Sequence, residues 1–128
     1  MNQKTERAFT KDDETVIQLF SELGMPKNLA KTLIYISQAE HCRSQDIEEG
    51  IELLQPQVSI AIQELRKKGW VKKHDKKKKG KGRPVHHYQL TKPLPEILKI
   101  FEHEKINEIE NIKKNFNELE SILNEVKT

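Results

Sequence analysis

The sequence has few of the residues that build disulfide-bonded or membrane-embedded structures. One cysteine, Cys42, occurs in 128 residues, so no internal disulfide can form and a reducing cytoplasm is expected. No run of about 18 apolar residues is present, which excludes a membrane-spanning helix. Residues 1–11 are polar and lack the apolar core of a secretion signal. Because only 34% of the residues are hydrophobic and 34% are charged, we expect one small core and a long exposed element.

Signals for catalysis and metal binding are also missing. The sequence contains no glycine-rich phosphate loop, no nucleophile motif and no HExxH pair, so we expect neither an enzyme nor a cofactor. The metal-ligand residue types form the adjacent pairs His41-Cys42 and His86-His87, whereas zinc sites use spaced pairs, and we expect no metal. A redox role for Cys42 is a weaker alternative to a half-buried structural thiol.

The chain does contain a strongly basic tract. Residues 66–83 hold eleven Lys or Arg and one acid, a net charge of +10, while the whole chain carries +3 and the remainder therefore −7. The basic residues are Arg66, Lys67, Lys68, Lys72, Lys73, Lys76, Lys77, Lys78, Lys79, Lys81 and Arg83. A local concentration of positive potential beside an acidic remainder favours binding of a polyanion.

Apolar residues at helical spacing predict four helices before the hairpin region. The first is expected to be capped by Asp12 or Asp13 and to stop at Gly24, and the second to run from Pro26 to about residue 38. Ser44 is the expected cap of a short third helix. In the fourth helix, residues 56–68, the apolar side chains recur at i, i+3, i+4 and i+7 and predict one buried stripe: Val58, Ala61, Ile62 and Leu65.

Two strands and a long helix are predicted to follow. Residues 70–73 and 85–90 favour a β-hairpin, and the lysine-rich segment 76–84 connects the two strands. From residue 94 to about residue 126 one helix is expected. Its second half has apolar residues at spacings of 3, 4, 3, 4 and 3, the pattern of a coiled-coil interface: Ile109, Ile112, Phe116, Leu119, Leu123 and Val126. These six residues, named here the heptad stripe, predict pairing with a second copy, and folding back into the same chain is the alternative.

Two segments resemble a known family of proteins. Residues 55–71, with Gln55-Pro56, Val58-Ser59 and Lys68-Gly69-Trp70-Val71, look like the recognition helix of MarR, ArsR and TrmB-like regulators. Gly82-Arg83-Pro84 followed by His87-Tyr88 resembles their wing. The resemblance covers residues 26–90 and implies a winged helix-turn-helix fold that binds DNA.

The sequence departs from the family pattern at two positions. Glu52 stands where the turn of the motif usually has glycine, and Leu54 stands where a capping serine is usual. A residue other than glycine can adopt the left-handed conformation there at a cost of about 1 kcal/mol. We therefore expect a turn that is less regular than that of the family.

The expected architecture is mainly α with a small β-hairpin. It consists of a flexible start (residues 1–11), a winged helix-turn-helix domain (12–92) and a C-terminal coiled-coil helix for dimerisation (93–128). On the fourth helix the residues expected to face DNA are Gln55, Gln57, Ser59, Ile60, Gln63, Arg66 and Lys67. Glutamine can pair with adenine in the major groove, and Ile60 suits a thymine methyl group.

Two further groups complete the expected DNA contacts. Lysines of the wing suit phosphates, and Arg83 between Gly82 and Pro84 suits a narrow minor groove: the wing residues are Lys76, Lys77, Lys78, Lys79, Lys81 and Arg83. The first helix of the motif contributes Arg43, Ser44 and Gln45.

The sequence thus predicts a homodimeric, sequence-specific regulator of transcription that binds double-stranded DNA. A nonspecific or architectural DNA-binding protein and a winged-helix protein-interaction module are the alternatives. Whether a small-molecule effector binds is left open, because the sequence contains no separate ligand-binding domain that would indicate one.

Overall fold

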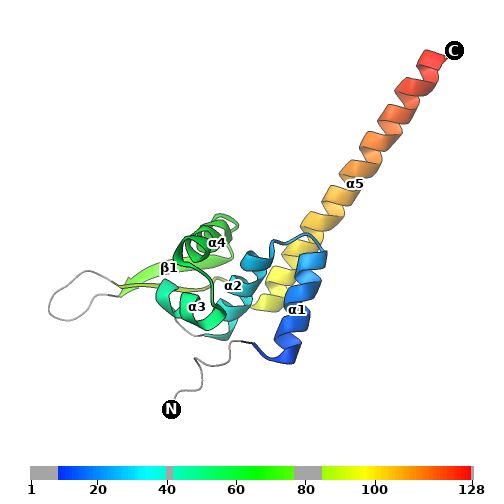
Figure 1. The fold of residues 1–128 in the computed structure, drawn as a ribbon. Coiled ribbons are helices and arrows are strands. Elements are labelled where there is room, and N and C mark those ends of the chain that lie inside the picture. Colours follow the sequence, from blue (N-terminus) through cyan, green and yellow to red (C-terminus); the bar gives the residue numbers. More distant parts are fainter. Residues whose placement is uncertain (1–8, 40–41, 77–84, 128) are drawn as a thin grey trace. The chain divides into compact units, whose positions relative to one another are not determined.

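The computed structural model describes residues 9–39, 42–76 and 85–127, without the side chains of residues 75, 76, 85, 126 and 127. In these described residues five helices and two strands follow one another (Figure 1). They are α1 (Lys11–Glu22), α2 (Lys27–Gln38), α3 (Ser44–Ile51), α4 (Gln55–Lys67), β1 (Val71–Lys76), β2 (Val85–Leu90) and α5 (Leu94–Lys127). The chain divides into two compact units, Met1–Pro93 and Leu94–Thr128. No described helix combines the length and the apolar character needed to cross a bilayer.

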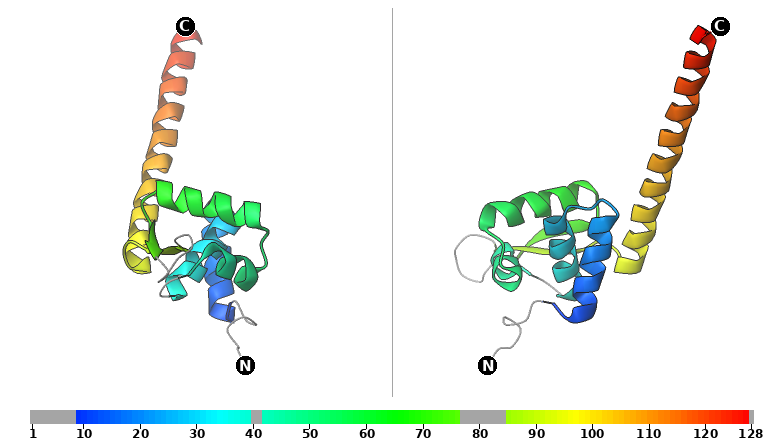
Figure 2. Two further views of the ribbon diagram at one scale, coloured as in Figure 1. Left: turned by 90° about the vertical axis from the view of Figure 1, so that its left-hand side faces the viewer. Right: turned by 45° about the vertical axis from the view of Figure 1, so that its right-hand side comes forward.

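Helix α2 is the centre of the first unit. It contacts α1, α3, α4 and β2, and it lies between α1 and α4 (Figure 2). Its apolar positions are buried as the sequence predicted: Leu29, Ala30, Leu33, Ile34 and Ile36. Helix α4 turns Val58, Ala61, Ile62 and Leu65 toward this centre, so the predicted stripe is confirmed. Burial of these aliphatic side chains supplies the main stabilisation of the unit.

The starts of α1 and α3 differ from the expected ones. The prediction that Asp12 or Asp13 caps α1 is wrong, because the Thr10 hydroxyl accepts a hydrogen bond from the Asp13 N–H at 3.1 Å and the Asp13 carboxylate accepts one from the Thr10 N–H at 3.0 Å. This reciprocal pair is a capping box, which needs its acid three residues after the cap. In α3 the expected cap, Ser44, is instead the first helical residue.

Helices α1 and α4 end in the same way. After α4, Gly69 has a φ of +81°. The Trp70 N–H donates to the Leu65 carbonyl at 3.0 Å, and the Gly69 N–H donates to the Arg66 carbonyl at 3.0 Å. This is a Schellman motif, which satisfies the last carbonyls of the helix and requires a left-handed residue after the C-cap. It turns the chain directly from α4 into β1.

The hairpin is antiparallel, and Val71 pairs with Leu90 at its base. Strand β2 has the predicted limits, whereas β1 begins one residue later and ends three residues later than predicted, because its ladder continues through charged residues. Cys42 adds an isolated bridge to β2. The Tyr88 N–H donates to the Cys42 carbonyl at 2.8 Å, and the Cys42 N–H donates to the Tyr88 carbonyl at 3.3 Å. The segment that precedes α3 is thereby joined to the hairpin.

Helices α2 and α3 approach each other closely at Gly50. A Cβ atom built on this buried glycine would lie 2.7 Å from Cζ and 2.8 Å from Oη of Tyr35. Atoms at such distances overlap, so the ring or the helix would have to shift. The absence of a side chain at Gly50 therefore permits the observed distance between α2 and α3.

We expect Gly50→Ala to destabilise the protein by about 1–2 kcal/mol, because the overlap with Tyr35 outweighs the gain in helix propensity. Urea unfolding followed by Trp70 fluorescence measures this loss. Glu49→Ala, at the neighbouring position, serves as the control and should unfold like the wild type. An unchanged midpoint for Gly50→Ala would contradict the close approach of the two helices.

Candidate nucleic-acid interface

Helix α4 presents a polar face on the side away from its buried stripe. Each residue of an α-helix turns by about 100°, so the four residues within about 30° of the outward direction are Pro56, Ile60, Gln63 and Lys67. These four residues, named here the outward face of α4, are all exposed. Ile60 is the apolar one, and 66% of its surface is exposed. Such a face offers hydrogen-bonding groups and one aliphatic surface to a ligand.

The other residues predicted on α4 lie beside the outward face. Gln55, Gln57 and Arg66 are exposed, while Ser59 is half-buried. One exposed acid, Glu64, was not among the predicted residues although it lies one turn after Ile60. The position of Glu64 beside the outward face can be worked out from the buried stripe, because the stripe fixes which side of the helix faces outward. Its negative charge, however, does not favour contact with a polyanion.

The turn before α4 confirms one expectation from the sequence. Glu52 adopts the left-handed conformation, with φ +57° and ψ +45°. Leu54 stands at the N-cap position, and 70% of its surface is exposed. Its side chain cannot cap a helix, and the Gln57 Oε1 atom accepts a hydrogen bond from the Leu54 N–H at 2.9 Å instead. The glutamine half of a capping box is therefore present without the serine half.

Arg43, predicted to contact DNA, is engaged within α3. Its Nη2 lies 3.0 Å from Oδ1 of Asp46 and its Nε lies 3.3 Å from Oδ2. Partial burial alone would raise the pKa of Asp46, but hydrogen bonds and charge from Arg43, with a smaller effect of His87, lower it below its ordinary value. A phosphate would have to share Arg43 with this carboxylate. Ser44 and Gln45 follow in the first turn of α3, half-buried and exposed respectively.

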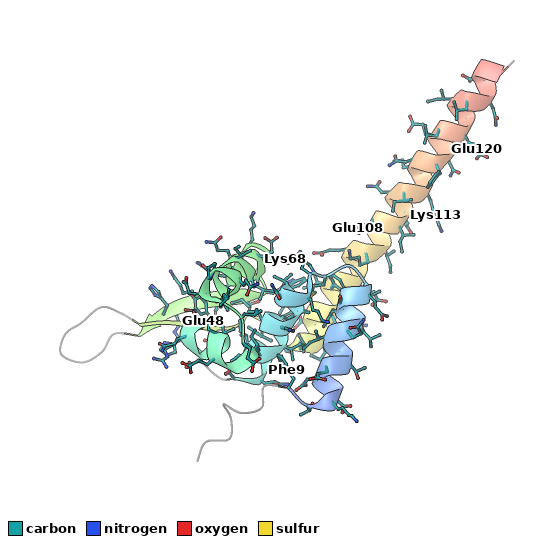
Figure 3. All side chains as sticks on the ribbon, in the orientation of Figure 1. Phe9, Glu48, Lys68, Glu108, Lys113 and Glu120 are labelled. Atoms are coloured by element: carbon teal, nitrogen blue, oxygen red, sulfur yellow. The ribbon has the colours of Figure 1, made fainter. Side chains whose placement is uncertain are left out.

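Basic side chains continue from the end of α4 into the hairpin. Lys68 at the end of α4 (Figure 3) lies over the buried Trp70 ring, with Nζ at 5.1 Å from the ring centroid. Lys72 and Lys73 on β1 are both exposed, and neighbouring strand residues point to opposite faces. These three lysines belong to the basic tract but were not among the predicted site residues.

The predicted wing residues lie mostly outside the described part of the chain. Lys76 ends β1, and only its backbone is described. Lys77, Lys78, Lys79, Lys81 and Arg83 lie outside the described residues. Their expected contacts with phosphate or minor groove thus remain predictions from the sequence.

Cys42 is a fully packed side chain rather than a half-buried one. Only 2% of its surface is exposed, and its Sγ lies 3.8 Å from the Tyr88 carbonyl oxygen. Burial, with a smaller effect of the Asp46 charge, raises the pKa of the thiol to about 12. A thiol that stays protonated at neutral pH is a poor nucleophile and a poor redox sensor. Among the described residues no three His, Cys, Asp or Glu side chains are grouped as a metal site would require.

The heptad stripe lies along the second half of α5. Its described side chains are exposed by 51% to 66%: Ile109, Ile112, Phe116, Leu119 and Leu123. The side chain of Val126 lies outside the described part of the chain. Charged residues, among them Glu108, Lys113 and Glu120 (Figure 3), are exposed along the same helix. Five large apolar side chains on one face of a helix are typical of a surface that another helix covers.

Among known proteins, similarity was found only to solved structures. No family model and no curated protein matches the chain. A mutant of MepR from a multidrug-resistant clinical isolate of Staphylococcus aureus is similar with a TM-score of 0.52, 18% sequence identity and coverage of 88% of this chain and 89% of that chain. ZitR from Lactococcus lactis has a TM-score of 0.47 at 15% identity and covers 82% of this chain and 75% of that chain. Pex from Synechococcus has a TM-score of 0.43 at 21% identity over 62% and 80% of the two chains.

The similarity to MepR bears on the fold. Together with the helix order, the α3–α4 turn and the β1–β2 hairpin, it shows that the chain has a winged helix-turn-helix fold. The fold class expected from the sequence is confirmed. In the usual nomenclature of this fold, the helix at the position of α4 is called the recognition helix and the hairpin is called the wing.

We expect Cys42 to react with a thiol reagent only when the protein unfolds, because its protonated sulfur has almost no contact with solvent. Labelling with iodoacetamide at pH 7.5 should be slow in buffer and rapid in concentrated urea, as followed by mass spectrometry. An exposed cysteine introduced by Gln63→Cys provides the matched control and should react in both solutions. Equal labelling of Cys42 in the two solutions would show that the thiol is accessible.

Proposed function

We propose that this chain binds double-stranded DNA as a homodimer and regulates transcription. The observation that carries the proposal is the position of the outward face of α4 and the exposed lysines of β1. Both lie in one compact unit and are joined by the single turn at Gly69. A polar helix followed at once by a basic hairpin suits a duplex, because the helix fits the major groove and the lysines approach the phosphates beside it.

The electrostatics support this assignment over a neutral partner. The end of α4 carries the exposed Arg66 and Lys67, and β1 adds Lys72 and Lys73. The tract from residue 66 to residue 83 has a net charge of +10 in a chain of +3. Release of counterions from DNA would then supply much of the binding free energy. The fold adds to this support, because MepR is a transcription regulator of the S. aureus multidrug efflux pump MepA.

Sequence specificity is the finer part of the proposal. Gln63 and Ile60 can contact base edges from the centre of the outward face of α4, whereas lysines on flexible side chains contact phosphates without reading sequence. Two such helices related by a two-fold axis would bind a pseudo-palindrome. Its half-sites would be separated by about one turn, roughly 10 bp, or a multiple of it.

Affinities of two variants for selected and scrambled duplexes distinguish a sequence-specific regulator from a nonspecific DNA-binding protein. Gln63→Ala should reduce the ratio of affinities for a selected duplex and a scrambled duplex by about tenfold or more, since one good base contact contributes about 1–3 kcal/mol. Lys72→Ala with Lys73→Ala should weaken both complexes alike and lower the slope of log K against log salt by about 1, because the two side chains point to opposite faces of β1 and one of them faces the duplex. Fluorescence anisotropy over a salt series measures both effects.

Two exposed lysines outside α4 and the hairpin, Lys11 at the start of α1 and Lys27 at the start of α2, provide the matched control for the charge change. Lys11→Ala with Lys27→Ala should leave affinity and salt slope near the wild-type values. Equal affinities of the wild type for selected and scrambled duplexes would favour the architectural alternative. Absence of DNA binding at low salt would contradict the proposal. A protein-interaction module would then be the remaining alternative.

The dimer is proposed from the heptad stripe. The exposed apolar residues repeat with the 3–4 spacing that lets two helices pack side by side. In a parallel pair Glu108 would stand beside Lys113 of the second copy, and in an antiparallel pair Lys113 would stand beside Glu120 of the second copy. Either arrangement matches opposite charges at the edge of the stripe, so a second copy of this chain is the partner proposed for it.

We expect Phe116→Lys to separate the dimer, because it places a charge in the middle of the apolar contact. Light scattering should give twice the chain mass of 15.0 kDa for the wild type and 15.0 kDa for the variant. Asn117→Lys adds the same charge one residue away, outside the stripe, and should remain dimeric. A wild type that is monomeric at tens of micromolar would contradict the proposed pairing.

A further inference from the structure

Gln57 and Gln63 on α4 are the same type of residue, but their surroundings in the structure differ. Gln57 uses its side-chain oxygen at the start of the helix, where Oε1 accepts the hydrogen bond from the Leu54 N–H at 2.9 Å. The identity of this atom is fixed by chemistry, since a backbone N–H requires an acceptor and the amide nitrogen is only a donor. Gln63 is exposed in the middle of α4.

The start of α4 has few other means of satisfying its backbone groups. The first four N–H groups of a helix have no partner within it. Pro56 has no N–H, and the Gln57 N–H donates to the Leu54 carbonyl at 3.0 Å. The leucine at the N-cap offers no side-chain acceptor, so the hydrogen bond from the Leu54 N–H to Gln57 is the side-chain contact that orders this turn. The left-handed Glu52 just before it already raises the free energy of the turn.

The direction of the two side chains agrees with this difference. Gln63 and Ile60 lie within about 30° of the direction opposite the buried stripe, while Gln57 lies about 90° from it, at 100° per residue. Gln57 would reach a base at the centre of the face only by leaving Leu54. Such a movement would release the capping hydrogen bond just where the helix begins.

We propose that Gln57 is a positioning residue, which holds the first turn of α4 for docking, and that Ile60 and Gln63 determine the base preference. This inference rests on the proposed DNA binding and assigns the reading of bases within it. Gln57 acts through the helix start. Gln63 keeps both its oxygen and its amide group for an adenine, and Ile60 beside it meets a thymine methyl group. The favoured contact sequence is thus rich in A·T pairs at the centre of each half-site.

The test compares Gln57→Ala, Leu54→Ser/Gln57→Ala and Gln63→Ala in the full chain. Leu54→Ser supplies the missing half of the capping box, because a serine oxygen at the N-cap accepts the N–H of residue 57. Leu54 is exposed, so its replacement removes little buried surface. Each protein is melted, and each selects duplexes from a pool with a randomised core of about two helical turns, roughly 20 bp. Affinities for the best selected duplex and for its scrambled form are then measured well below the melting temperature.

We expect Gln57→Ala to lower the Tm by about 4–8 °C, as loss of a helix cap does, and to leave the selected base preference unchanged. Leu54→Ser/Gln57→Ala should recover both the Tm and the affinity of the wild type. Gln63→Ala should melt like the wild type but lose about tenfold or more of its discrimination between the two duplexes. Rescue by a residue that cannot reach the bases would distinguish positioning from reading.

Three results would overturn the inference. One is an altered base at one position of the sites selected by Gln57→Ala. Another is a double variant that recovers the Tm but not the affinity, and the third is an unchanged Tm for Gln57→Ala. If the wild type selects no sequence while Gln57→Ala still melts early, the proposed function fails and the assignment of base reading fails with it. The helix cap would then stand alone as a structural result.

Discussion

The turn that joins α4 to β1 fixes the geometry on which the proposed DNA contacts depend. Gly69 in its left-handed conformation lets Trp70 bond back to Leu65, and both side chains are buried. The chain returns to the same point after the hairpin, because the Thr91 N–H donates to the Trp70 carbonyl at 2.9 Å and the Thr91 hydroxyl donates to the Gly69 carbonyl at 2.6 Å. The end of α4, the start of β1 and the end of β2 therefore meet at one hydrogen-bonded junction, and the relative direction of helix and hairpin follows from it.

Charge is distributed unequally around this junction. The lysines and arginines follow the end of α4 and enter β1, whereas α3 carries Asp46, Glu48 and Glu49. Arg43, the N-cap residue just before α3, is paired with Asp46. Binding of a polyanion would thus be favoured at the hairpin side and opposed along most of α3. In the proposed complex this charge distribution would orient the domain on a duplex, and the polar groups of α4 would distinguish one base sequence from another.

Most of the fold could be predicted from the sequence because its signals are local. Apolar spacing identified the buried stripe of α4 and placed the end of that helix within one residue of the observed one. The end of β1 was missed because polar residues such as His74 and Asp75 favour a strand only through their partners on β2. The true cap of α1 was missed because Thr10 and Asp13 act as a pair. The different surroundings of Gln57 and Gln63, and the pairing of Arg43 with Asp46, depend on side-chain geometry that spacing cannot supply.

The bridge between Cys42 and Tyr88 connects the hairpin to the segment before α3. Pairing of β1 with β2 alone would not provide this connection. Two backbone hydrogen bonds hold β2 to the residue that stands two positions before α3. In the proposed complex, a force on the hairpin would pass along β2 into the first turn of α3 and so to the other half of the helix-turn-helix. A rigid duplex and a flexible one would then be distinguished by the work needed to deform the protein, in addition to the chemistry of their base edges.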